Sequence, residues 1–216
     1  MRNRTRPASP NSLKNNAKKW TKELLSEIRR AKKAKGAKRR VPVRYYDRYK
    51  KPDVQATLAA MYQHLCCYCE SRIGVVDYPH IEHRRPKRRF PRTAFAWDNL
   101  HWACIQCNDA KGEKWDRKNP ILDAVDDKVD DHLSYYAVYR TEKTKRGDTT
   151  IQHAKLNREG LLETRQGLLT DFIGLVHDIQ LSTDASRRRV AKQILSRKCQ
   201  GEHGSFFTYL RDLSFG

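Results

Sequence analysis

Two short cysteine motifs are the first candidates for chemistry, Cys66-x-x-Cys69 and Cys104-x-x-Cys107. Two cysteines separated by two residues can present both sulfurs to one point, and two such turns complete a tetrahedral site of four thiolates. The sequence therefore predicts one structural Zn²⁺ held by these four cysteines. Disulfides are the alternative, and they are disfavoured because nothing in the sequence suggests an oxidising compartment.

The segment between the cysteine pairs, together with the residues that follow the second pair, carries groups suited to phosphodiester hydrolysis. His83 can accept a proton from water near neutral pH, which makes it the candidate general base. Glu82 and Asn108 offer hard oxygen donors suited to a single Mg²⁺ or Mn²⁺ that keeps several waters. Lys111 lies one helical turn after Asn108, so we expect it to meet the phosphate from the same face.

A run of cations directly follows the candidate base. Its members are Arg84, Arg85, Lys87, Arg88 and Arg89. Their place beside His83 favours the positioning of phosphates, and simple solvated charges are the alternative. For His80 a supporting hydrogen bond is favoured, while a second metal ligand and an exposed side chain stay open.

The order of these residues resembles the HNH, or ββα-metal, endonucleases. That signature is an acidic residue and a histidine, then Asn-Leu, then a zinc CxxC motif followed by His or Asn and by Lys-Gly; here the three letters are His83, Asn99 and Asn108. The resemblance implies that Glu82 and Asn108 hold the catalytic metal beside the leaving oxygen. Asn99 is expected to orient the loop that bears His83 through hydrogen bonds to the backbone. Glu before the base and Asn as third letter depart from the broader pattern, and both suit an oxygen-ligated Mg²⁺.

A narrower resemblance, to the PtuB-like HNH subunit of Septu-type antiphage systems, extends over about residues 10–180. It includes a helix that bears Trp20, a downstream stretch with Thr150-Ile151, Leu156-Asn157-Arg158, Leu161 and Arg165, and three central motifs. These motifs are Ile-Glu-His-x-x-Pro-Lys from residue 81, Trp-Asp-Asn-Leu from residue 97 and Cys-Asn-x-x-Lys-Gly from residue 107. The resemblance implies a PtuA-like ATPase partner, and the chain itself has no GxxxxGK[ST] motif, so nucleotide gating must come from such a partner. A retron reverse transcriptase with its RNA–DNA hybrid is left open as a further component.

The composition agrees with a nucleic-acid partner. The 216 residues carry a formal net charge of +20 and a mean hydropathy of −0.89. A transmembrane helix is excluded because no run approaches 18 apolar residues, and the N-terminus lacks an apolar signal region, so we expect a cytoplasmic protein without a membrane partner. A strongly basic chain favours a polyanion as partner.

The positive charge concentrates in residues 1–52, which hold 19 Lys and Arg against three acidic residues. Trp20, Leu24, Ile28 and Ala31 recur at helical spacing there, so they predict a helix that docks through this face and exposes its cations. A helix lying on a membrane surface would look similar, but the nuclease motifs favour nucleic acid.

The expected fold class is α+β, with a ββα-metal core braced by the four-cysteine zinc site, an N-terminal basic helix and a C-terminal helical region. Residues 1–52 are interpreted as a basic arm, 53–120 as the HNH core and 121–216 as the mainly helical region. Residues 72–82 predict strand, turn and strand, and residues 135–139 predict one strand. Helices are expected to open near residue 104 and to cover about 161–179 and the surroundings of 190–195.

The sequence thus predicts a metal-dependent HNH endonuclease that cleaves nucleic acid in an antiviral defence complex, and it does not choose between DNA and RNA as the substrate. Two alternatives stay open, namely RNA such as tRNA as the substrate, and a zinc-stabilised nucleic-acid-binding module without catalysis. The combination of Glu82, His83 and Asn108 favours the enzyme, since a pure binder has no physical need to keep them together.

Overall fold

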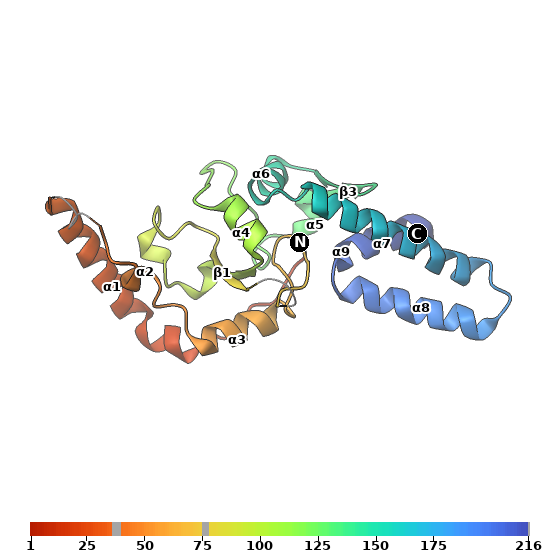
Figure 1. Ribbon diagram of the computed structural model, residues 1–216, viewed down its shortest axis with the longest axis horizontal. Helices are drawn as coiled ribbons and strands as arrows, with labels where there is room; N and C mark the ends of the chain where they lie inside the picture. The colour runs from red at the N-terminus through yellow and green to blue at the C-terminus, as the bar shows by residue number, and fades with distance from the viewer. Residues whose placement is uncertain (36–39, 75–77, 216) are drawn as a thin grey trace.

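The computed structural model describes residues 1–35, 40–74 and 78–215, and it shows an α+β fold, which confirms the expected class. The molecule is elongated, with a helix at one end, a small hairpin and helix at the centre, and three packed helices at the other end (Figure 1). The long helices are α1 (Asn11–Lys33), α7 (Glu159–Gln180), α8 (Ala185–Gln200) and α9 (Gly204–Phe215).

The centre of the molecule is a ββα unit. Strand β1 (His80–His83) pairs antiparallel with β2 (Leu100–Ala103), with His83 opposite Leu100, and α4 (Ile105–Lys111) begins two residues after β2 ends. Two 3₁₀ turns, η2 (Pro91–Thr93) and η3 (Trp97–Asn99), connect the strands. Between residues 72 and 82, the described positions form a strand only from residue 80 onward, and residues 75–77 of the predicted first strand and turn lie outside the described residues.

Helix α1 docks on this centre through its apolar face, which confirms the predicted helix and its orientation. Leu13, Leu24 and Ala31 are buried, and the Trp20 ring meets the Phe95 ring edge-on at 5.7 Å between centroids. The short helix α2 (Val43–Tyr46) contacts α1 and leads into α3 (Pro52–Met61), which starts with a proline that the first turn of a helix tolerates.

The region after α4 is more structured than the sequence indicates. It contains α5 (Val129–His132), the hairpin β3 (Leu133–Tyr136) and β4 (Tyr139–Glu142), and α6 (Lys145–Ala154). The predicted single strand at 135–139 is wrong, because the chain turns there with Ala137 in the left-handed region at φ 48°.

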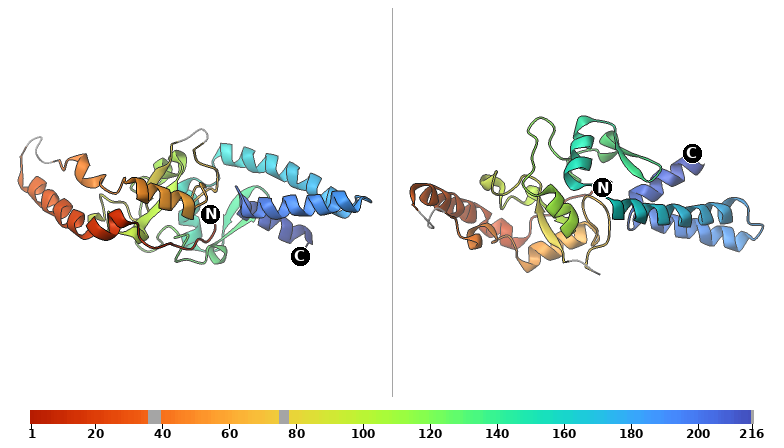
Figure 2. Two further views of the ribbon diagram at one scale, coloured as in Figure 1. Left: turned by 90° about the horizontal axis from the view of Figure 1, so that it is seen from below. Right: turned by 45° about the horizontal axis from the view of Figure 1, so that its top comes forward.

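Helices α7 and α8 lie side by side and α9 packs against both (Figure 2). Phe172, Leu195, Phe206 and Phe207 fill a second apolar cluster between these helices, separate from the cluster that supports the ββα unit. The break between α7 and α8 has a clear local cause, because the Asp184 carboxylate accepts hydrogen bonds from the first free N–H groups of α8. Within the described residues, the longest helices are too polar to cross a bilayer.

Candidate active site and zinc centre

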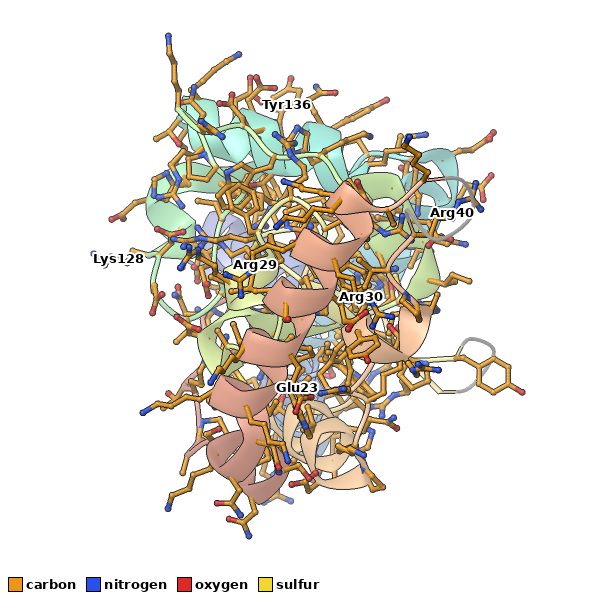
Figure 3. The ribbon with its side chains drawn as sticks, turned by 90° about the vertical axis from the view of Figure 1, so that its left-hand side faces the viewer. Glu23, Arg29, Arg30, Arg40, Lys128 and Tyr136 are labelled. Atoms are coloured by element: carbon orange, nitrogen blue, oxygen red, sulfur yellow. The ribbon has the colours of Figure 1, made fainter. Side chains whose placement is uncertain are left out.

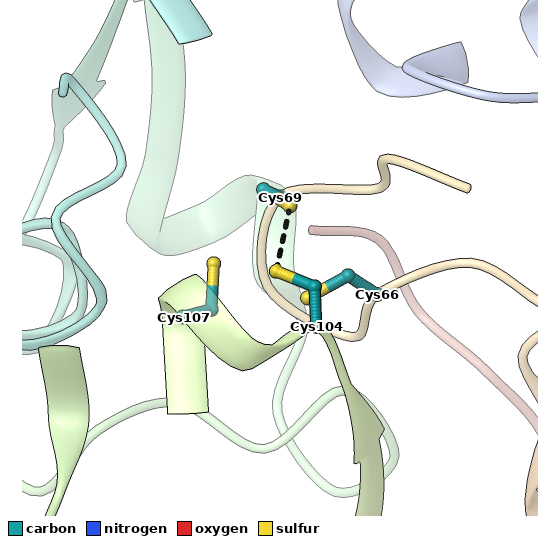
Figure 4. A group of neighbouring side chains, drawn as sticks. All are labelled: Cys66, Cys69, Cys104 and Cys107. Atoms are coloured by element: carbon teal, nitrogen blue, oxygen red, sulfur yellow. Dashed lines mark hydrogen bonds between the residues drawn. The ribbon is translucent and has the colours of Figure 1, made fainter. Parts of the chain in front are cut away.

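The four cysteines of the CxxC motifs come together in one buried cluster (Figure 4). Cys66 and Cys69 lie in the turn after α3, while Cys104 precedes α4 and Cys107 lies in its first turns. All four sulfurs lie within 4.8 Å of one another, and the Cys69 and Cys104 sulfurs are 3.8 Å apart. Four sulfurs about 2.3 Å from a tetrahedral Zn²⁺ are about 3.8 Å apart, so this cluster fits a structural zinc ion.

A guanidinium group stands beside this cluster. Arg158, at the start of α7, places Nη1 3.4 Å from the Cys107 sulfur and Nε 2.8 Å from the Gln106 side chain. A Zn²⁺ held by four thiolates carries two net negative charges, so a cation at its edge offsets part of that charge. Arg158 belongs to a downstream stretch that resembles the PtuB-like family, but no ligand spacing places it beside Cys107, 51 residues away in the chain.

His83 ends strand β1 and is fixed from two sides. Its Nε2 donates a hydrogen bond to the Ala94 carbonyl at 2.9 Å, and the Tyr49 ring packs edge-on with 4.5 Å between centroids. Burial, reinforced by the nearby Lys87 ammonium, lowers the pKa of His83 to about 3. The imidazole is therefore neutral at pH 7, and because Nε2 carries the proton, Nδ1 is left as a free acceptor.

A groove of about 660 Å³ runs past His83 and brings most of the expected residues together. Glu82 and His83 line it from β1, and Asn108 lines it from α4. Lys87 and Arg88 add positive charge to its wall. The groove thus combines a base, oxygen donors and cations on one surface.

Glu82 is a buried residue of β1, and only one of its two carboxylate oxygens has a partner among the described residues. Its Oε1 lies 2.5 Å from the Lys111 ammonium and accepts a hydrogen bond from the Tyr68 hydroxyl at 3.3 Å. Its Oε2 takes part in no hydrogen bond with a described residue, and Glu82 lines the groove. Burial raises the pKa of Glu82 despite the opposing pull of Lys111.

The structure contradicts the expected contact between Lys111 and the phosphate. Its side chain is 0% exposed, and besides Glu82 it donates to the His83 carbonyl at 2.8 Å. Lys111 therefore holds Glu82 and the end of β1 in place from inside the unit, and it does not reach the groove.

Asn108 and His80 lie next to each other in the groove, with 3.4 Å between Asn108 Nδ2 and His80 Nδ1. Asn108 Oδ1 accepts no hydrogen bond from the residues that the structure describes. Glu82 Oε2 and Asn108 Oδ1 are thus two hard oxygen donors beside open space, a set that fits Mg²⁺ or Mn²⁺ with water completing the coordination.

Asn99, in η3, is 5% exposed and is hydrogen-bonded only to backbone and to Thr93. Its Oδ1 accepts from the Arg85 N–H at 2.7 Å, and its Nδ2 donates to the Arg85 carbonyl at 3.0 Å and to the Thr93 carbonyl at 3.1 Å. These contacts tie the chain after His83 to the connection that leads to β2, so Asn99 shapes the loop and does not touch the groove.

The five expected phosphate-binding cations divide into two groups. Lys87 and Arg88 line the groove. The other three do not: Arg84 lies 3.7 Å from the Asp123 carboxylate, Arg85 is exposed elsewhere, and Arg89 donates to the Glu113 carbonyl. Arg84 and Arg85 are not among the residues that line the groove, and Arg89 meets it only through the carbonyl of the lining residue Glu113.

Residues of the N-terminal arm complete the groove, and sequence reasoning did not find them. The Lys87 ammonium is held 2.8 Å from Asp47 Oδ1 and 2.9 Å from the Tyr49 hydroxyl, and Lys50 holds the other oxygen of Asp47 at 2.7 Å. Tyr49 and Lys50 also line the groove. No motif or periodicity marks these residues, so only their tertiary placement identifies them.

Comparison with known proteins agrees with this geometry. Residues 66–114, which hold the cysteines, β1, β2 and α4, match the HNH endonuclease family. Over 154 residues the chain is 29% identical to the Septu protein PtuB of Bacillus thuringiensis, an alignment that covers 71% of this chain and 53% of that protein. Over 160 residues it is 28% identical to the Septu protein PtuB of Bacillus mycoides strain KBAB4, covering 59% of this chain and 54% of that relative.

The ββα unit, its cysteine cluster and the matched segment identify residues 66–114 as an HNH domain. More narrowly, the chain is PtuB-like and resembles the two Septu proteins of that name, which confirms the resemblance drawn from the motifs. The chain spans about half the length of the curated relatives that it matches. Neither comparison bears on a retron, so that part of the expectation stays a prediction.

Proposed function

We propose that this chain is a metal-dependent endonuclease that hydrolyses phosphodiester bonds of nucleic acid as the nuclease effector of an antiphage defence complex. The observation that most supports this is the single groove onto which His83, Glu82 and Asn108 all open, with the Lys87 and Arg88 cations beside them. The match of residues 66–114 to the HNH endonuclease family supports the same reaction.

His83 acts as the general base in this proposal. Its neutral imidazole accepts the proton of an attacking water at Nδ1, while the Ala94 carbonyl and the Tyr49 ring hold the ring in place. The water oxygen then attacks phosphorus, and the bond from phosphorus to the leaving oxygen breaks. The leaving oxygen takes a proton from solvent, while Lys87 and Arg88 offset the negative charge of the phosphate. Lys87 is suited to this role because Asp47 and Tyr49 fix its ammonium group in advance.

Glu82 and Asn108 would hold one Mg²⁺ or Mn²⁺ through Oε2 and Oδ1. When bound, that ion supplies positive charge to the phosphate and to the leaving oxygen. Lys111 keeps the Glu82 carboxylate in position, and the Zn²⁺ at the four cysteines has a structural role only.

The test is cleavage of plasmid DNA and of total tRNA by wild-type protein and by His83→Ala, each in Mg²⁺, in Mn²⁺ and without divalent metal. His177 is 66% exposed and distant from the groove lining, so His177→Ala is the matched control. We expect metal-dependent cutting that His83→Ala loses and His177→Ala keeps, at unchanged zinc content. Wild-type-like cutting by His83→Ala would overturn the site assignment. The substrate that is cut decides between DNA and RNA.

An ATPase subunit of the PtuA-like kind is the partner we propose, on the similarity to proteins named Septu protein PtuB. Co-expression of this chain with a PtuA-like ATPase subunit should yield a complex that survives size-exclusion chromatography, and cleavage should be assayed in that complex as well. If the complex binds nucleic acid in a salt-sensitive way but cuts nothing in any metal, the non-catalytic binding module replaces the endonuclease.

A further inference from the structure

One face of α1 carries a row of cations, which we call the α1 stripe. It consists of Lys14, Lys18, Lys22, Arg29 and Lys33. The steps of four, four, seven and four residues place all five on one side of a helix, opposite the buried Leu13, Leu24 and Ala31. All five side chains are exposed, and none forms an ion pair with any residue in the described part of the chain.

The two acidic residues of α1 lie off this face and are already engaged. Glu23 pairs with Arg48 of the following segment, and Glu27 lies 3.5 Å from Arg30. Figure 3 looks onto α1 along the length of the molecule and shows Arg29 and Arg30 projecting on opposite sides of the helix. The positive field of the stripe is therefore not neutralised from within α1.

The stripe is also held rigidly relative to the groove. Trp20 packs on Phe95, Asp53 accepts a hydrogen bond from the Ser12 N–H at 2.8 Å, and α2 contacts α1. The groove residues Tyr49 and Lys50 follow α2 directly. At 1.5 Å per residue the stripe from Lys14 to Lys33 is about 28 Å long, which equals about eight base pairs at 3.4 Å each, close to one turn of a duplex.

We infer that the α1 stripe binds the sugar–phosphate backbone of a nucleic-acid duplex outside the groove, so that the substrate is contacted over about one extra helical turn. The inference rests on the proposed function and narrows its substrate to a duplex, of DNA or of RNA. A duplex is the occupant because the stripe is straight and rigid and contains no aromatic side chain, whereas single-strand binders add aromatic residues on which bases stack. The only aromatic residue of α1, Trp20, packs inward on Phe95.

The test compares the salt dependence of binding in a five-fold glutamine variant of the stripe with that of a matched control of equal charge change. The stripe variant is Lys14→Gln, Lys18→Gln, Lys22→Gln, Arg29→Gln and Lys33→Gln. The control variant replaces five exposed cations elsewhere, namely Arg117→Gln, Lys155→Gln, Arg189→Gln, Lys192→Gln and Arg197→Gln. Glutamine keeps helix propensity, and circular dichroism and zinc content verify the fold of each variant.

Binding is measured by fluorescence anisotropy without divalent metal, on duplex DNA and duplex RNA of 10, 20 and 30 base pairs and on single strands of the same lengths. Each phosphate contact adds about 0.9 to the slope of log K against log salt for a duplex. With three or more contacts, the slope should fall by at least about 2.7 in the stripe variant, so the wild type loses about 40-fold more affinity than the variant between 50 and 200 mM salt. The stripe variant should also lose the gain in affinity from 10 to 20 base pairs.

If the salt slope is unchanged in the stripe variant, or falls equally in the stripe and control variants, the inference is overturned. The stripe would then be only a solvated face of α1. A loss confined to single strands would overturn the duplex assignment. If the stripe variant binds nucleic acid normally but no longer binds the ATPase partner, the inference is overturned and the stripe is a contact surface for that protein. Stripe-dependent binding without any cleavage by wild-type protein would support the inference while rejecting the proposed function, whereas cleavage with no stripe effect would do the reverse. The duplex that the wild-type protein binds more tightly identifies whether the stripe binds DNA or RNA.

Discussion

Replacing Lys111 with methionine tests the ion pair at the centre of the ββα unit. Methionine keeps an unbranched apolar stem but removes the ammonium, which lies 2.5 Å from Glu82 Oε1 and 2.8 Å from the His83 carbonyl. The Lys111 and Glu82 side chains are 0% and 4% exposed, so the substitution leaves Glu82 Oε1 without its charged partner inside the protein. Breaking a buried pair from one side costs about 3–5 kcal/mol, and we expect the free energy of unfolding of Lys111→Met to fall by that amount.

A double-mutant cycle separates the ion pair from simple packing. Glu82→Gln removes the carboxylate charge at nearly constant shape, and the Tyr68 hydroxyl can still donate to the new amide oxygen. Because the double variant leaves no unpaired charge, it should be about 2 kcal/mol more stable than the sum of the single losses predicts. Urea unfolding followed by circular dichroism in zinc-saturated buffer measures all four proteins. Lys155→Met, at an exposed lysine, is the control and should change stability by less than about 0.5 kcal/mol.

Additive losses in this cycle would refute the reasoning, because they would show that Lys111 and Glu82 do not interact. A loss of less than about 1 kcal/mol for Lys111→Met would refute it as well, since it would mean that the carboxylate finds solvent when its partner is removed.

Three further outcomes follow from contacts elsewhere in the structure. Asn99→Ala removes an amide that makes three hydrogen bonds to backbone groups, and at about 1 kcal/mol each it should lower the free energy of unfolding by about 3 kcal/mol in urea titration; a change below about 1 kcal/mol would contradict the loop-shaping role. Arg158→Gln removes the cation beside the Cys107 sulfur, so this variant should lose zinc to a chromophoric chelator faster than the control variant Arg189→Gln does. Equal rates of zinc transfer from the two variants would argue against a role for this contact. Burial opposes ionisation of Asp123, but His101, 3.6 Å away, and Arg84, 3.7 Å away, outweigh it and hold the pKa of that carboxyl below its usual value. This carboxylate therefore stabilises the fold above the unfolded pKa of about 3.9 and loses that effect as the pH falls through lower values, so stability measured between pH 5 and pH 3 should decline less steeply in Asp123→Asn than in wild type.

The parts of the site that sequence predicts are those set by local spacing. Cys66 and Cys69 must share one turn, and an acidic residue directly before His83 must lie on the same strand, so their geometry follows from the chain itself. The α1 helix can also be predicted from the sequence, because its apolar residues repeat with a helical period.

The parts that sequence reasoning misses depend on which surfaces meet. Spacing puts Lys111 one turn after Asn108, but it does not reveal that β1 and Glu82 cover that side of α4. Asp47 and Tyr49 reach His83 and Lys87 only through the docking of the arm, some 34 to 40 residues away in the chain. The turn at Ala137 carries neither glycine nor asparagine, so the tyrosine-rich segment around it looks like one strand.

The four-cysteine cluster supports the elements that line the groove, although none of its cysteines lines it. Two four-residue strands and a seven-residue helix are each too short to be stable alone, so something must fix the angle between them. Cys104 sits at the junction of β2 and α4, and the Cys67 N–H donates to the Trp102 carbonyl at 2.8 Å, which ties the first cysteine turn to β2. Structural zinc contributes about 10–16 kcal/mol of apparent binding energy in small domains, as much as the whole stability of a typical fold. We therefore expect Asn108 to keep its place opposite Glu82 only while a metal ion is bound at the four cysteines, so the proposed cleavage activity and the zinc content should be lost together.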